Sequence, residues 1–181
     1  MPSSPATRRL LLLGPSLLLT VLMFFHPSPY DHIGDELIPI ATWWTVLHTL
    51  QFFLFAGVGA SVWMLVAGLR GYAATIARVA AMIFVLFYDI GDAVAGIATG
   101  LLAGNAAGGD LPETAAVTTI NAIFKDFTKD VFFDVGILAW ILALATTAVA
   151  LYRAGTPLVP TLLLAIPAFL LTFDHAFPYG T

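Results

Sequence analysis

Residues 79–104 form an apolar stretch long enough to cross a bilayer, yet two aspartates, Asp89 and Asp92, interrupt it near its middle. A carboxylate at that depth is costly, so such residues usually face a protein interior or a wet cavity and mark a functional site. Because the two are three positions apart, both can lie on one face of a helix. The sequence therefore predicts a polar site inside the membrane and leaves its reaction and ligand open.

The same stretch carries glycines at every fourth position, at Gly96, Gly100 and Gly104. Small residues at this spacing let two helices approach closely in a membrane. Asp92 lies one step earlier on the same stripe, so we expect it to point into the bundle. Residues 79–104 are thus predicted to form the central helix.

Two histidines lie on small-residue stripes of other apolar segments, His48 near the start of the second and His175 near the end of the last. At a rise of 1.5 Å per residue, an axial gap of about 10 Å separates His48 from Asp92. We expect one outward-opening cavity with two sets of lining residues. The ligand-binding set is His48, Gln51, Asp89, Asp92 and Asp134, and the metal-binding set is His48, His175, Asp92 and Asp174.

Imidazole and carboxylate together suit a divalent metal such as zinc, and a metal-bound water could hydrolyse a lipid or another amphiphile. Three alternatives stay open. The chain could be a proton-coupled carrier using Asp89 and Asp92, a haem protein with His48 and His175 as axial ligands, or an accessory subunit whose buried acids only set helix register. His48 could equally be a structural residue bonded to a neighbouring carbonyl. Whether the chain is an enzyme is not decided.

The composition explains why these residues must be held by membrane helices. The 181 residues are 60% hydrophobic and 10% charged, and the mean hydropathy is +0.94. These values predict an all-α polytopic membrane bundle. We expect the membrane to be the plasma membrane of a bacterial-type cell. Its partners are the lipid bilayer and, as a further option, other membrane subunits. The lack of cysteine excludes thiol catalysis and Cys-ligated metals, and no basic cluster suggests nucleic acid.

Apolar runs separated by polar turns predict five transmembrane helices. Residues 1–9 are expected to be a cytoplasmic tail, and residues 10–181 a single five-helix transmembrane domain. The five predicted spans cover residues 10–25, 43–69, 79–104, 131–152 and 158–177. Residues 26–41 are expected to form a loop, and residues 114–130 an amphipathic helix.

Basic residues predict the orientation of this bundle. In the five-span arrangement one side carries Arg8, Arg9, Arg70, Arg78 and Arg153, whereas the other carries only Lys125 and Lys129. The positive-inside rule then predicts a cytoplasmic amino end and an outer carboxyl end.

The segments RGYAATIARVAAMIFVLFYDIGDAVAGIATGLL and HTLQFFLF resemble small uncharacterised multi-pass membrane proteins of bacteria. This resemblance covers about a third of the chain and implies no function. The mixture of His and Asp is also similar to that of membrane hydrolases that hold zinc between helices. Those proteins have seven spans and motif spacings that this chain lacks.

Overall fold

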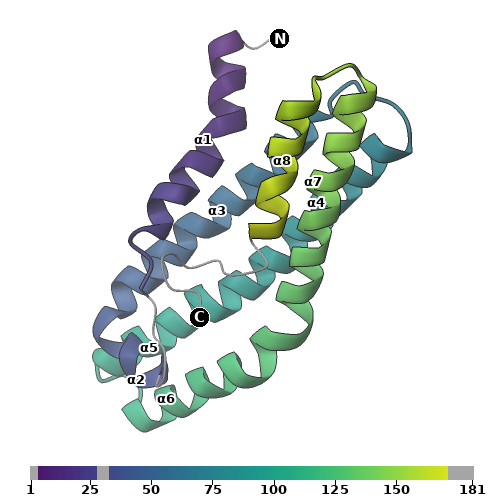
Figure 1. The fold of residues 1–181 in the computed structure, drawn as a ribbon. Helices are drawn as coiled ribbons and strands as arrows, with labels where there is room; N and C mark the ends of the chain where they lie inside the picture. The colour runs from purple at the N-terminus through teal and green to yellow at the C-terminus, as the bar shows by residue number, and fades with distance from the viewer. Residues whose placement is uncertain (1–3, 28–32, 171–181) are drawn as a thin grey trace.

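The computed structural model describes residues 4–27 and 33–170, and these are folded almost entirely into helices, with no strand among them (Figure 1). The α-helices are α1 (Pro5–Met23), α2 (Ile33–Leu37), α3 (Ala41–Leu65), α4 (Tyr72–Asp92), α5 (Thr99–Ala107), α6 (Glu113–Ala122), α7 (Phe133–Arg153) and α8 (Leu158–Leu170). A 3₁₀ turn η1 (Ile38–Ile40) and two π-helical segments, η2 (Ala93–Ala98) and η3 (Ile123–Phe132), join some of them without a break.

Four helical runs among the described residues are long and apolar enough to cross a membrane: Pro5–Met23, Ile33–Leu65, Tyr72–Ala107 and Phe133–Arg153. The all-helical bundle predicted from the sequence is confirmed. The predicted fifth span, 158–177, is described only as far as Leu170, so the count of five and the orientation stay predictions.

Helix α1 begins earlier than the sequence indicated. Ser4 is its N-cap, and its hydroxyl accepts a hydrogen bond from the backbone N–H of Thr7 at 3.1 Å. Pro5 occupies the first turn, where its missing N–H leaves no hydrogen bond unmade. Arg8 and Arg9 are therefore helical, although both were expected to lie in a tail.

The segment before α3 is helical instead of an open loop, because α2 and η1 lead directly into α3. Its apolar side chains pack against α5 and α6 in one buried cluster at one end of the molecule (Figure 1). The core of this cluster consists of Leu37, Ala41, Trp44, Ala103 and Ile120.

The run Tyr72–Ala107 has 36 residues and, at 1.5 Å per residue, is about 54 Å long. Since the hydrocarbon core of a bilayer is about 30 Å thick, the ends of this run extend beyond it. Helix α4 packs against both α3 and α7, so the central place predicted for residues 79–104 agrees with the structure.

The glycine stripe packs on α3 in one antiparallel register. A Cβ atom added at Gly100 would lie 2.2 Å from the hydroxyl oxygen of Thr45, whereas one at Gly104 would lie 4.0 Å from its nearest neighbour, Ala41. Packing of the stripe on α3 is therefore tight at Gly100 and looser toward Gly104.

Helix α7 covers the other side of α4. A Cβ at Gly136 would lie 3.0 Å from Cβ of Tyr88, so the two backbones nearly touch there. One helical turn away from this contact, aromatic rings from α3, α4 and α7 pack together. The ring centroid of Phe84 lies 4.7 Å from that of Trp140 and 6.1 Å from that of Phe55. Helix α8 packs on α7. The predicted amphipathic helix 114–130 is confirmed as helical, formed by α6 and η3.

Candidate functional site

A histidine and an aspartate meet in the interior of the bundle. Nε2 of His48 on α3 lies 3.9 Å from Oδ1 of Asp92 on α4, and each residue is only 3% exposed. The structure thus brings together two residues that the sequence assigned to one cavity. The predicted axial gap of about 10 Å does not keep their side-chain ends apart, because the imidazole reaches along α4 by about one helical turn.

Gly96 makes this reach possible. It follows Asp92 by one turn, and a Cβ there would lie 2.0 Å from Cγ of His48. The imidazole therefore occupies the volume that any other residue would fill with its own side chain. Glycine here is required by close approach, with no need for a special backbone angle.

The orientation of the His48 ring is set by its own helix. Nδ1 lies 2.9 Å from the backbone oxygen of Trp44, one turn earlier. A carbonyl oxygen can only accept, so Nδ1 carries the hydrogen and Nε2 is the nitrogen that faces Asp92. The hydrogen bond to a neighbouring carbonyl, which the sequence suggested as a structural alternative, is therefore present together with the contact to the acid.

Aromatic rings enclose the histidine. The ring of Trp44 lies 4.2 Å from that of His48, and the ring of His26 lies 5.2 Å from it in an edge-to-face arrangement. His26 was expected to be a loop residue, but it is only 9% exposed, and its Nδ1 contacts the oxygen of Pro27 at 2.6 Å. Sequence reasoning missed it because nothing in its local pattern indicates burial.

A threonine also missed from the sequence ties these rings to the π-helical segment. The indole N–H of Trp44 donates to the hydroxyl of Thr99 at 3.2 Å, and that hydroxyl donates in turn to the backbone oxygen of Ala95. Thr99 is fully buried and lies one position before Gly100. Its place beside the glycine stripe is the signal that could have identified it.

Buried acceptor oxygens accompany the pair. Among the described residues, Oδ2 of Asp92, Oδ1 of Asp89 and Oε1 of Gln51 have no hydrogen-bond partner. Gln51 is fully buried, and its amide nitrogen lies 3.7 Å from the sulfur of Met23 on α1. Buried acceptors without donors are costly, so this region favours a proton or a bound donor.

Three predicted members remain: Asp134, Asp174 and His175. Asp134 is exposed on α7, and its predicted place in the cavity stays a prediction. His175 and Asp174 lie outside the described residues. Within 4–27 and 33–170, no three or more His, Asp or Glu side chains gather closely enough to hold a metal ion, so metal binding is not supported there.

No protein-family model, curated protein or solved structure matches the chain. The function must therefore be inferred from the site itself.

Proposed function

We propose that this chain is a proton-coupled carrier or relay of the plasma membrane, and that His48 and Asp92 together hold the proton it moves. The observation that carries the proposal is the 3.9 Å approach of Nε2 to Oδ1 inside the bundle. Acidic residues paired with histidine inside membrane helices are typical of proton pathways.

The pair is neutral when it holds one proton in addition to the hydrogen on Nδ1. That proton is either on Asp92, which then faces the lone pair of Nε2, or on Nε2, which then faces a carboxylate. Any other proton count leaves a net charge in a site with 3% exposure, and such a charge is costly in a medium of low dielectric constant. The site therefore favours one proton that can shift between two atoms.

Titratable groups extend the pair in both directions. Asp89 lies one helical turn from Asp92 toward the arginine-bearing end of α4 and is 4% exposed. His26 touches the ring of His48 on the opposite side, at the end of α1. We propose the order Asp89, Asp92, His48, His26 for the proton path, with small shifts or a water between successive groups.

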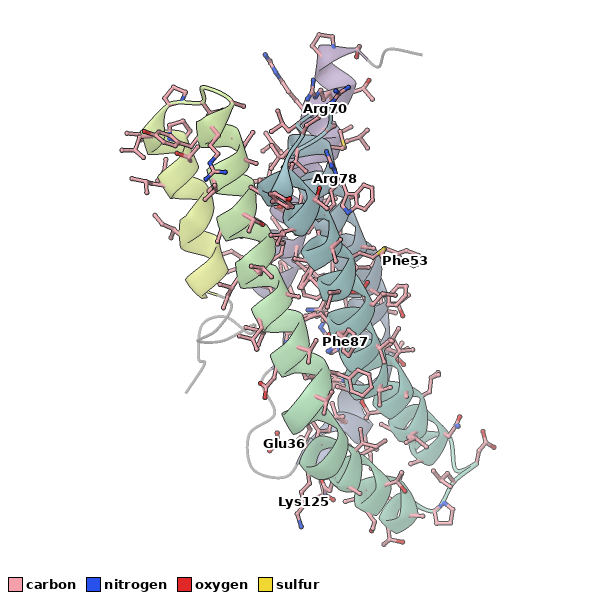
Figure 2. The ribbon with its side chains drawn as sticks, turned by 90° about the vertical axis from the view of Figure 1, so that its right-hand side faces the viewer. Glu36, Phe53, Arg70, Arg78, Phe87 and Lys125 are labelled. Atoms are coloured by element: carbon pink, nitrogen blue, oxygen red, sulfur yellow. The ribbon has the colours of Figure 1, made fainter. Side chains whose placement is uncertain are left out.

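The five-span topology with a cytoplasmic amino end belongs to the same proposal. Figure 2 shows Arg70 and Arg78 at one end of the bundle and Lys125 and Glu36 at the other. This separation supports the positive-inside argument. The path would then run from Asp89, nearer the inner side, to His26, nearer the outer side.

A metal-dependent role is the weaker candidate. A zinc site needs three or four protein ligands, and the described residues include no group of three or more His, Asp or Glu placed to hold a metal ion. It would therefore depend on His175 and Asp174.

Infrared difference spectroscopy across a pH step tests the proposal without knowledge of a transported substrate. We expect a carboxyl band and an imidazole band that change at the same pH, because one proton is shared. Asp92→Asn should remove the carboxyl band and also shift the pH at which the imidazole band changes. Asp134→Asn is the matched control, since that carboxylate is exposed and should leave the coupled bands unaltered. Independent titration of the two bands would refute the shared proton.

A further inference from the structure

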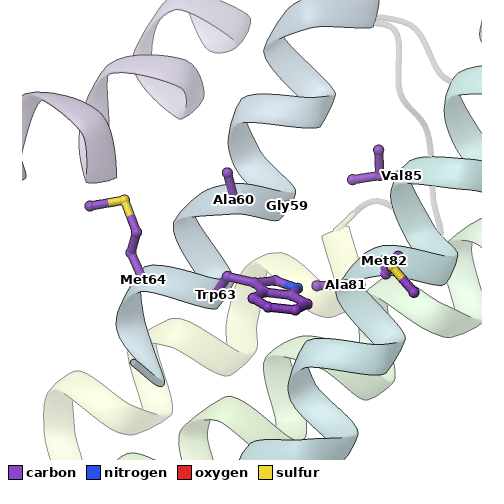
Figure 3. Close-up of a pocket in the computed structure, with 7 residues that line it drawn as sticks. All are labelled: Gly59, Ala60, Trp63, Met64, Ala81, Met82 and Val85. Atoms are coloured by element: carbon purple, nitrogen blue, oxygen red, sulfur yellow. The ribbon is translucent and has the colours of Figure 1, made fainter. Parts of the chain in front are cut away.

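A second feature lies on the face of the bundle where α3 and α4 pack side by side. A shallow groove of about 450 Å³ runs between the two helices, and every residue lining it is apolar or glycine (Figure 3). The lining residues are Gly59, Ala60, Trp63, Met64, Ala81, Met82 and Val85. Gly59 forms part of its floor, because a Cβ there would lie 2.3 Å from Cγ2 of Val85.

The groove ends at an arginine. The indole N–H of Trp63 donates to the backbone oxygen of Arg78 at 3.0 Å, which joins the α3 wall to the first turns of α4. Met82 and Val85 follow Arg78 by four and seven positions, so the three share one face of α4. A cationic side chain therefore lies on the line of the groove, one turn beyond its last apolar residue.

The guanidinium of Arg78 is held in place and still has donors to offer. Its Nη2 donates to the backbone oxygens of Val66 and Leu69, at 2.6 and 2.9 Å. A guanidinium has five N–H groups, and those on Nε and Nη1 make no hydrogen bond with the residues described. Arg70, which is exposed in the turn between α3 and α4, adds a second positive charge at this end of the groove (Figure 2).

We infer that this groove binds one anionic phospholipid, with an acyl chain between α3 and α4 and the phosphate beside Arg78 and Arg70. An apolar groove alone would not select a lipid, because the tails of the surrounding bilayer are as apolar as its walls. Selection must come from the headgroup, and a planar guanidinium binds phosphate oxygens with two parallel hydrogen bonds. The charge at the groove's end therefore identifies the occupant as anionic.

Native mass spectrometry of the detergent-solubilised protein, titrated with phosphatidylglycerol or phosphatidylcholine, tests this inference. We expect one phosphatidylglycerol to bind about 25-fold more tightly than phosphatidylcholine, at about fivefold for each arginine near the headgroup. Arg70→Gln should lower the preference by about fivefold. Arg153→Gln, which removes an exposed arginine from the end of α7, is the matched control and should leave it unchanged.

A second variant tests the groove separately from the charge. Ala60→Phe places a phenyl ring in the groove from an exposed position, so folding should be preserved while both lipids bind more weakly. Val149→Phe makes a similar change at an exposed site on α7 and should have no effect. Equal binding of the two lipids by the parent protein would overturn the inference. The inference would also be overturned if the parent protein were a dimer and Ala60→Phe made it a monomer without any loss of bound lipid. The groove would then be a protein interface.

Discussion

Replacing Gly96 by alanine is the most direct perturbation of the site, because a single methyl group would enter the volume that His48 occupies. The new Cβ would lie 2.0 Å from Cγ and 2.1 Å from Cδ2 of the imidazole. To restore an ordinary contact of 3.4 Å, the ring or its helix must retreat by about 1.4 Å. Rotation of the ring alone would break its 2.9 Å hydrogen bond to Trp44, and the ring of His26 lies close beside it.

The magnitude follows from two opposing terms. Overpacking of a well-filled interior typically costs about 1–3 kcal/mol. Alanine in place of glycine in a helix returns about 0.5–1 kcal/mol. We therefore expect Gly96→Ala to lower the free energy of unfolding by about 1–2 kcal/mol and to weaken the contact between His48 and Asp92.

Gly104→Ala is the control for this prediction, since it makes the same chemical change on the same stripe where the nearest atom is 4.0 Å away. It should leave stability unchanged or raise it by up to about 1 kcal/mol. Reversible unfolding in mixed micelles, followed by circular dichroism, gives both values. If the two variants unfold at the same detergent composition, His48 does not pack over Gly96 and the geometry of the site is wrong.

Two further predictions concern the arginine-bearing end of the molecule. Arg78→Met should lower the free energy of unfolding by about 1–3 kcal/mol in the same assay, because the carbonyls of Val66 and Leu69 lose a charged donor; a variant as stable as the parent would show that these bonds contribute nothing. A reporter enzyme fused after Thr181 should be active only outside the cytoplasm, and one inserted at Gly155 only inside it; the reverse pattern would contradict the proposed topology and the direction of the proton path.

The sequence by itself determined which helix would carry the buried acids and which of its faces would pack. Both depend on local periodicity and on the cost of a carboxylate in hydrocarbon, and neither needs knowledge of a partner. The inward position of Asp92 and the close packing at Gly100 are accordingly found as expected. Helix ends were less predictable, since the start of α1 at Pro5 depends on one hydrogen bond that the Ser4 hydroxyl accepts from the backbone N–H of Thr7.

Only the tertiary structure decided what the acids would meet. The contact between His48 and Asp92 depends on how far an imidazole reaches across a neighbouring helix, and a count of residues along two separate helices contains no such information. His26 is buried by rings from α3, a long-range contact that its own Pro-rich surroundings do not indicate.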